Sequence, residues 1–169
     1  MDALEAILTR RSVRDYTNGR VSENDIQQLL GAAMSSPSAG NQQPWQFVVI
    51  DDRQMLNAIP NIHPYANMLR KSPLAILVCG DLNREKHEGF WVQDCAACAQ
   101  NILLAARALN LGAVWLGAYP REDRVDGLRK LLDLPEQIIP LCVISIGHPA
   151  TDQGPANRYD ERRIHRNRW

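Results

Sequence analysis

The stretch from Phe90 to Pro120 (FWVQDCAACAQNILLAARALNLGAVWLGAYP) constrains the fold of this chain more than any other. Up to Leu109 its strongly polar residues recur at a seven-residue spacing and share one narrow stripe of a helix: Gln93, Asp94, Gln100, Asn101 and Arg107. The remaining positions are apolar, and a helix that is apolar on nearly every side is buried on most of them. We therefore predict that the chain folds around this helix, or around a pair of such helices in a dimer.

Further helices and strands follow from periodicity and from stop signals. Asn110 and Gly112 end the long helix, and Ala113–Leu116 reads as a short buried strand. Ser22 is a suitable N-cap, with Asp25 three residues later. Helices are predicted over residues 2–9, 22–34, 51–59, 65–71 and 122–132. Strands are predicted over 45–50, 73–79 and 138–146, the last interrupted by a proline near its start, and residues 80–88 read as a charged loop.

The length and the net charge of the chain limit which kinds of fold and partner are expected. A chain of 169 residues is long enough for one domain with a sizeable core. Lys and Arg number 19, as do Asp and Glu, so the net charge is zero. Nucleic acids and acidic membranes bind through positive excess, so neither is an expected partner. No apolar run approaches the roughly 20 residues of a membrane helix, and no signal-peptide core is present, so we expect a cytoplasmic protein.

The four cysteines lie in apolar segments: Cys79, Cys95, Cys98 and Cys142. Cys95 and Cys98 form a C-x-x-C, which at a helix N-terminus can be a redox pair. Here the pair lies inside an apolar helix and no second pair accompanies it. Core packing of reduced thiols is therefore the favoured interpretation.

Three arginines surround a serine in the segment RRSVRDY, residues 10–16. One interpretation is a phosphate clamp, because planar guanidinium groups pair with phosphate oxygens and a hydroxyl can add a further bond. The alternative is a solvated basic turn that Asp15 partly neutralises. The segment alone leaves both open.

A loop with three neighbouring amide side chains covers residues 35–47 (SSPSAGNQQPWQF). Asn41, Gln42 and Gln43 can each donate and accept, which suits a ligand such as a heterocycle. A polar surface loop is the alternative, and without other information it is favoured. The single His63, in a His-Pro turn, is interpreted as structural rather than as a metal ligand.

The last segment, residues 150–169, is polar and basic. It carries Arg158, Arg162, Arg163, Arg166 and Arg168. Few apolar residues are available to hold it on its own domain. We expect a tail that is either loose or lies on a partner subunit.

Several signatures of catalysis are missing from the sequence. It has no G-x-G-x-x-G, no P-loop motif, no G-x-S-x-G and no His, Cys and Asp cluster with metal spacing. Nothing indicates catalysis by a nucleophilic side chain. If the protein is an enzyme, a bound cofactor is expected to carry the chemistry.

The motifs occur in one order along nearly the whole chain. RRSVRDY is followed by SSPSAGNQQPW, by the alanine-rich helix with WLGAYP, and by IGHP and the arginine-containing tail. This ordered set resembles the FMN-dependent nitroreductase family, in its short NAD(P)H:acceptor oxidoreductase form. The resemblance implies an α+β fold with a central, mainly antiparallel sheet wrapped by helices. It also implies an intertwined homodimer with two FMN molecules at the subunit interface, a domain over residues 1–149, and a tail over 150–169 that extends across the partner.

The resemblance also implies which residues hold the cofactor. The motif that binds the FMN phosphate and ribityl chain is matched by Arg10, Arg11, Ser12 and Arg14. The loop that reaches the flavin bound mainly by the other subunit is matched by Pro37, Ser38, Ala39 and Asn41. The segment whose backbone lies beside the flavin ring near N5 is matched by Trp115, Leu116 and Gly117.

Two further positions belong to this implied site. Arg158 resembles the C-terminal cation that completes the phosphate site. Asn67 stands where many short relatives have a lysine near the flavin pyrimidine, and asparagine brings a hydrogen-bonding group without the charge. The short segment between Asp81 and Glu88 leaves little room for a lid over the cleft.

The implied activity is hydride transfer from NADH or NADPH through flavin N5 to an organic acceptor, a nitroaromatic, quinone or similar compound, in a ping-pong cycle. The flavin carries the chemistry, so no catalytic side chain and no metal are expected. The alternatives are a flavin-fragmenting or dehalogenating relative of the same fold, a non-catalytic FMN-binding module, and an interaction protein that uses its basic tail.

Overall fold

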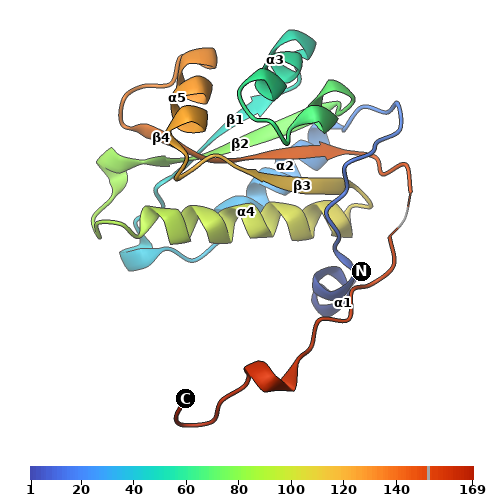
Figure 1. Cartoon of the computed structure of the whole chain (residues 1–169), viewed down its shortest axis with the longest axis vertical. Coiled ribbons are helices and arrows are strands. Elements are labelled where there is room, and N and C mark those ends of the chain that lie inside the picture. Colours follow the sequence, from blue (N-terminus) through green and yellow to red (C-terminus); the bar gives the residue numbers. More distant parts are fainter. Residues whose placement is uncertain (152) are drawn as a thin grey trace.

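The computed structural model describes residues 1–151 and 153–169. Over these residues the chain forms one antiparallel sheet with the strand order β1-β2-β4-β3 and helices on both of its faces (Figure 1). The strands are β1 (Trp45–Ile50), β2 (Leu74–Asp81), β3 (Gly112–Gly117) and β4 (Ile138–Gly147). The α-helices are α1 (Ala3–Thr9), α2 (Glu23–Met34), α3 (Arg53–Ala58), α4 (Trp91–Ala108) and α5 (Glu122–Leu131). The α+β architecture with a central antiparallel sheet is confirmed.

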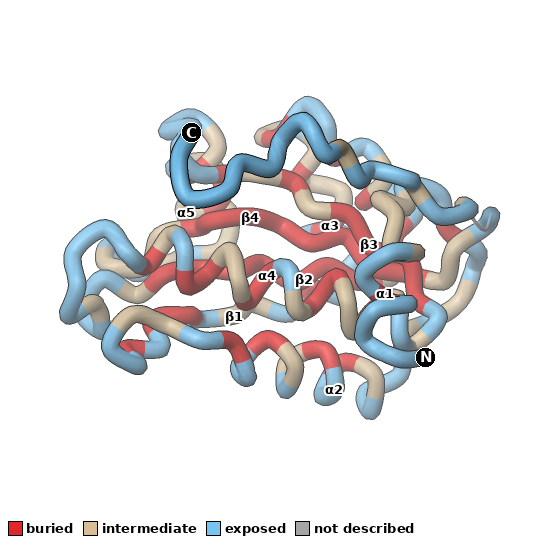
Figure 2. The backbone as a smooth tube through the Cα atoms, turned by 90° about the horizontal axis from the view of Figure 1, so that it is seen from below, coloured by how far each residue is buried: buried red, intermediate tan, exposed pale blue. Residues whose placement is uncertain are grey.

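The predicted central helix is α4, and it lies with α2 on one face of the sheet (Figure 1). One side of α4 is buried along its whole length, through Trp91, Asp94, Cys95, Cys98, Ala99, Ile102, Leu103 and Ala106. Figure 2 shows the strands in red, as buried, over much of their length, whereas α4 alternates red with tan. Cys95 and Cys98 are free, fully buried thiols in this cluster, so core packing is confirmed.

The predicted stop signal also ends α4. Asn110 has a positive φ of 57°, and the Leu111 N–H donates to the Ala106 carbonyl at 2.8 Å. This is the left-handed helix terminus that asparagine or glycine permits. It turns the chain directly into β3.

The other face of the sheet is covered by α3, α5 and short 3-10 turns (Figure 1). Two helix predictions were wrong in detail. The helix predicted over 51–59 begins at Arg53, because Asp52 caps it, and continues as a 3-10 turn over Ile59–Asn61. The helix predicted over 65–71 is a 3-10 turn over Asn67–Arg70, a segment too short for a stable α-helix.

Strands β2 and β4 also differ from the prediction. β2 continues to Asp81, so the charged loop begins later than expected. β4 is not interrupted by Pro140, because the register shifts between Val78 and Cys79 of β2 at the point where Pro140 pairs. A bulge is where a strand tolerates a residue that has no N–H.

The two ends of the chain lie away from this core. The tail leaves the body of the molecule and contains one 3-10 turn, Glu161–Arg163 (Figure 1). Helix α1 buries Ala6 against its own chain but leaves Leu4 and Leu8 exposed at 71% and 63%. No helix in the described part of the chain is both long and apolar enough to cross a membrane.

Candidate functional site

The arginine-rich segment runs beside the start of β3. The Val13 N–H donates to the Ala113 carbonyl at 3.0 Å, and Ser12 forms a parallel bridge with Ala113. This pairing fixes the segment at the outer edge of the sheet. It therefore places Arg10 and its neighbours beside the strand that the sequence predicts to lie along the flavin.

The structure brings Arg10 and Arg158 together, although they are far apart in the sequence. Both line a cavity of about 440 Å³ between α1 and residues 155–159 of the tail. Burial, together with the positive charges of Arg158 and Arg11, lowers the pKa of Arg10. No carboxylate among the described residues forms an ion pair with Arg10. Clustered cations without a counter-charge suit an anion such as a phosphate.

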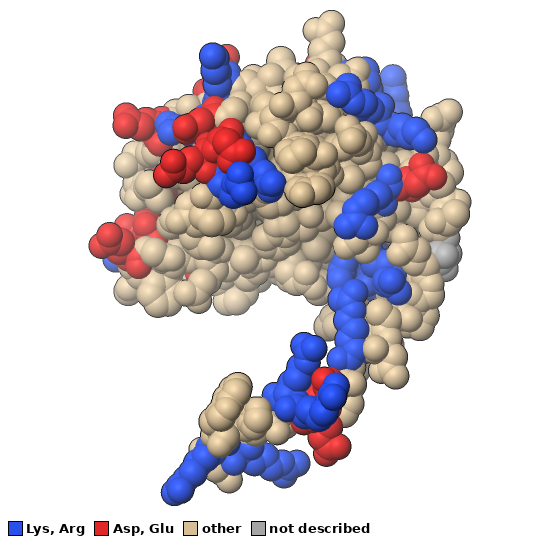
Figure 3. Space-filling view, viewed as in Figure 1, with Lys and Arg blue, Asp and Glu red and all other residues tan. Residues whose placement is uncertain are grey.

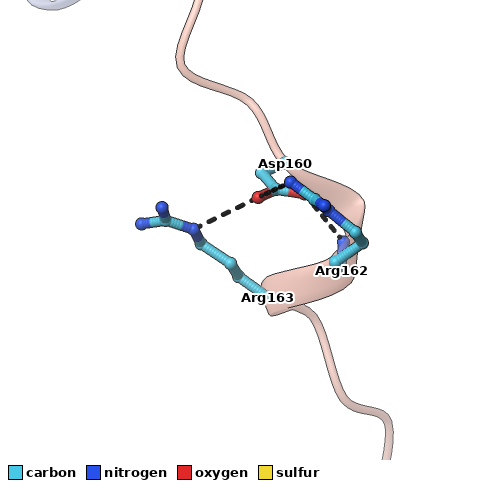
Figure 4. Close-up of polar contacts among 3 residues, drawn as sticks. All are labelled: Asp160, Arg162 and Arg163. Carbon is cyan, nitrogen blue, oxygen red and sulfur yellow. Dashed lines mark hydrogen bonds and ion pairs between the residues drawn. The ribbon is translucent and has the colours of Figure 1, made fainter.

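The other arginines of the two segments differ in what they contact. The Arg11 Nη1 donates to the Gly154 carbonyl at 2.8 Å, which ties the tail to the first motif. Arg14 is exposed, with its Nη1 at 3.5 Å from the Ser12 carbonyl. Arg162 and Arg163 both pair with Asp160, at 2.9 and 3.4 Å (Figure 4). The tail is basic from Arg158 onward, where Figure 3 shows several blue side chains, but the charges of Arg162 and Arg163 are already partnered.

The edge of β3 that faces away from β4 presents backbone groups of alternate residues. The Ala113 carbonyl faces outward, because it accepts from Val13, whereas the Ala118 N–H donates to Leu141 on the β4 side. Successive residues of a strand point their backbone groups to opposite sides. The N–H groups of Trp115 and Gly117 therefore point outward with Ala113, at an edge that a planar ligand can approach.

Space is open at Gly117 on the face of the sheet to which the Trp115 side chain also points. A methyl group built on Gly117 would meet its nearest neighbour, Nε1 of Trp115, only at 3.9 Å. The side chain of Leu116 points to the α5 face and is buried in the core, and its backbone groups face β4 opposite Val143, so Leu116 presents neither to the open edge. Asn67 is exposed on its 3-10 turn. Cations at one end of β3 and outward N–H groups at the other fit the phosphate and the ring of an FMN.

The loop after α2 is held on α4 by a buried carboxylate. Asp94 accepts from the Ala39 N–H at 2.9 Å and from the Gln42 side-chain amide at 2.7 Å. The side-chain oxygen Oε1 of Gln42 accepts from the backbone N–H groups of Lys86 and His87, at 2.7 and 3.0 Å. The amide of Gln42 is thus occupied inside the protein, and the interpretation of Gln42 as a ligand-binding group was wrong.

A second side chain of α4 holds the start of the same loop. The Asn101 amide donates to the Ala32 carbonyl at 3.0 Å and to the Ser36 hydroxyl at 2.9 Å. Asp94 and Asn101 belong to the polar stripe that the sequence predicts for α4, and both serve as anchors for this loop. Sequence reasoning missed this role, although their seven-residue spacing puts them on one side of the helix.

One chain does not bring the loop and the arginines together. The loop carries Pro37, Ser38, Ala39 and Asn41 and is held at Asp94, near the start of α4. The arginine segment lies near the other end, where the Arg107 Nε donates to the Thr9 hydroxyl at 3.0 Å. Thirteen residues of α-helix separate these points by about 20 Å. The two halves of the predicted site are therefore at opposite ends of α4 within a single chain (Figure 1).

Sequence reasoning also missed two side chains at the end of β3. His63 and Arg124 both reach the Gly117 carbonyl, at 2.9 and 2.8 Å. His63 was predicted to be structural, and its burial at this carbonyl confirms that prediction. No group of His, Cys, Asp and Glu in the part of the chain that the structure describes could hold a metal ion.

Comparison with known proteins gives consistent matches over the whole chain. The sequence model of the Nitroreductase family matches residues 7–66 and 62–148. A protein of Methanothermobacter thermautotrophicus, the "Putative NADH dehydrogenase/NAD(P)H nitroreductase", is 52% identical over 169 residues, which cover 100% of this chain and 88% of that protein.

Solved structures of similar proteins have the same fold. The "Putative NADH dehydrogenase/NAD(P)H nitroreductase" of Bacteroides thetaiotaomicron superposes with a TM-score of 0.95 at 49% identity, covering 99% of this chain and 98% of that chain. A "putative nitroreductase in complex with fmn" from Desulfovibrio desulfuricans superposes with a TM-score of 0.86 at 32% identity, covering 100% and 98%.

Proposed function

The chain belongs to the nitroreductase family, and we propose that it is an FMN-dependent oxidoreductase that transfers hydride from NADH or NADPH to an organic acceptor such as a nitroaromatic or a quinone. The observation that carries the proposal is the line of groups along β3. It begins with Arg10 and Arg158, neither of which forms an ion pair in the described residues, and ends with the outward N–H of Gly117.

We assign the phosphate end of the cofactor to Arg10, Ser12, Arg14 and Arg158, with Arg11 in support. Arg11 already holds the tail through Gly154, so its part is to fix Arg158 near Arg10 as well as to add charge. We assign the ring end to the outward backbone groups of Trp115 and Gly117, with Asn67 as a neutral hydrogen-bonding group near the pyrimidine. Leu116, which is paired to β4, fixes the register of the two residues beside it. Hydrogen bonds to ionised phosphate are about twice as strong as neutral ones, so the cations dominate affinity.

We propose that the second half of the site comes from the partner subunit of a homodimer. The loop that carries Pro37, Ser38, Ala39 and Asn41 runs from Asn101 toward the start of α4, where its Ala39 anchor at Asp94 lies about 20 Å from the contact between Arg107 and Thr9. This direction, away from its own chain's arginines, suits a loop that completes the partner's site. The exposed apolar residues of α1 and the projecting tail, residues 150–169, support such an interface. A monomer rarely exposes apolar side chains together in this way.

Bound FMN would supply the redox chemistry by accepting hydride at N5 and passing it on. The residues of the chain bind, orient and tune it. The outward N–H of Gly117 would donate to N5 of the oxidised ring and so make N5 a better hydride acceptor. We propose that donor and acceptor use one cleft in turn, in a ping-pong cycle. We also propose a cytoplasmic location, because four unpaired thiols suit a reducing compartment.

The visible absorption spectrum of the purified protein tests this function, followed by anaerobic addition of NADH and then NADPH. An oxidised-flavin spectrum that one nicotinamide bleaches, and that returns when a nitroaromatic or quinone is added, is the expected result. A flavin spectrum that neither nicotinamide bleaches would instead indicate a non-catalytic FMN-binding module. A protein that takes up no FMN would refute the proposal.

A further inference from the structure

The carbonyl of Gly117 is held by two side chains from outside the sheet. Gly117 is the last residue of β3, and its backbone groups point away from β4, so the sheet cannot pair its carbonyl. Nε2 of His63 lies 2.9 Å from this oxygen, and Nη1 of Arg124 lies 2.8 Å from it. Glycine has the widest backbone freedom of any residue, so these contacts restrict a strand end that would otherwise rotate easily.

The hydrogen bonds of His63 define its tautomer. The Tyr65 N–H lies 3.3 Å from Nδ1, which must therefore accept. The proton of the neutral ring is then on Nε2 and is donated to Gly117. Burial and the neighbouring charge of Arg124 lower the pKa of His63, consistent with a neutral ring. With 2% of its surface exposed, His63 is fixed in this orientation.

Arg124 forms no ion pair in the part of the chain that the structure describes. The adjacent Asp123 pairs with Arg121 at 3.2 Å, and this contact lowers the pKa of Asp123, as does the nearby charge of Arg124. The Arg124 guanidinium lies over the Tyr65 ring, 5.8 Å from its centroid. Its Nε is buried without a hydrogen-bond partner, which costs stability. Its Nη1 bond to Gly117 and its contact with Tyr65 are therefore the interactions that hold this side chain in place.

We propose that His63 and Arg124 are positioning residues that fix Gly117 so that its N–H faces the flavin, and that the charge of Arg124 favours the reduced cofactor. The proposal rests on the proposed function. With Leu116 paired to β4 and the Gly117 carbonyl held from the other side, the backbone on both sides of Gly117 is fixed. A fixed donor needs no reorganisation when negative charge develops on the ring.

The experiment compares four variants with the wild type. Arg124→Met and His63→Ala remove the donors, whereas Arg124→Lys and His63→Gln keep a donor at each position. Arg121→Met is the matched control, because Arg121 is exposed and pairs only with Asp123. The first measurement is amide hydrogen exchange of residues 112–119 in the protein freed of FMN. The second is the midpoint potential of bound FMN.

We expect faster exchange at the end of β3 in Arg124→Met and His63→Ala, with wild-type exchange in the Arg121→Met control. We also expect the equilibrium between reduced and oxidised flavin to fall roughly tenfold in Arg124→Met. A tenfold change is about 30 mV for a two-electron couple. The conservative variants should lie nearer to the wild type in both measurements.

Two results would overturn the proposal. Unchanged exchange in both donor-removing variants would mean that the contacts do not hold Gly117. Faster exchange with an unchanged potential would mean that they serve the fold and not the cofactor. A wild-type protein that binds no FMN is a separate result, because it refutes the proposed function whatever the exchange data show.

Discussion

Replacement of Asp94 by Asn tests the buried contact that holds the loop on α4. The residue is 5% exposed, and each carboxylate oxygen accepts one bond. Asn has the same shape but only one acceptor. If the side-chain oxygen of the introduced Asn keeps the bond from the Ala39 N–H, its side-chain nitrogen faces the side-chain nitrogen of Gln42. Both nitrogens are donors, so no hydrogen bond can form between them. Gln42 cannot turn, because its oxygen already accepts from two backbone N–H groups.

The expected cost is one charge-assisted hydrogen bond and one buried donor left without an acceptor. Together these give a loss of about 2–4 kcal/mol in the free energy of unfolding. Urea denaturation at one fixed protein concentration measures it, because a dimer's midpoint depends on concentration. The neighbouring exposed Gln93, replaced by Ala, is the control and should change stability by less than about 0.5 kcal/mol. A cost for Asp94→Asn no larger than the control's would refute this account of the loop.

Three further results are expected. Arg10→Ala should raise the Kd for FMN roughly 10- to 150-fold, the equivalent of about 1.5–3 kcal/mol for a charge-assisted contact, while the control Arg121→Ala leaves the Kd unchanged. Fluorescence titration measures these affinities, and an Arg10→Ala protein that binds FMN as tightly as the wild type would remove Arg10 from the site. Gly80→Ala should destabilise the protein by about 1–3 kcal/mol, because the new methyl group would lie 2.3 Å from Cε3 of Trp91. Gly31→Ala should stabilise it by about 0.5–1 kcal/mol, because Gly31 lies within a helix and its new methyl group would meet no atom within 4 Å. Thermal or urea unfolding compares the two variants, and the reverse order of stability would contradict the packing. Burial raises the pKa of all four cysteine thiols, so a thiol reagent at pH 8 should label the folded protein slowly. Labelling should reach four equivalents per chain only in denaturant, and rapid labelling of the native protein would contradict the place of the cysteines in the core.

The parts of the fold that were predicted correctly are those that a local pattern specifies. The period of α4, the turn at Asn110 and the apolar run of β3 each depend on residues close in sequence. The parts predicted wrongly depend on distant partners. The periodicity places Asp94 and Asn101 on one polar stripe but does not show what they bind, because the loop atoms come from a segment more than fifty residues earlier in the chain.

The candidate site also contains features that a sequence pattern predicts and features that no pattern shows. The grouping of Arg10 with Arg158 followed from a family pattern and matches the structure, although the residues are far apart in sequence. The contacts of His63 and Arg124 with Gly117 carry no such pattern. A backbone carbonyl is the same chemical group at every residue, so the side chains that bind it leave no motif in the sequence. Only the register of β3 shows that this carbonyl faces outward.

The open side of β3 has a consequence for handling the protein. A strand edge with unpaired N–H groups is a template for pairing with another chain. The chain itself covers the start of this edge through Val13 and closes its end through His63 and Arg124, but Trp115 between them is left uncovered by the described residues. A flavin seated there would shield the gap as well as react. Protein stripped of its cofactor would then be the form most prone to self-association, and FMN would act as its solubilising agent.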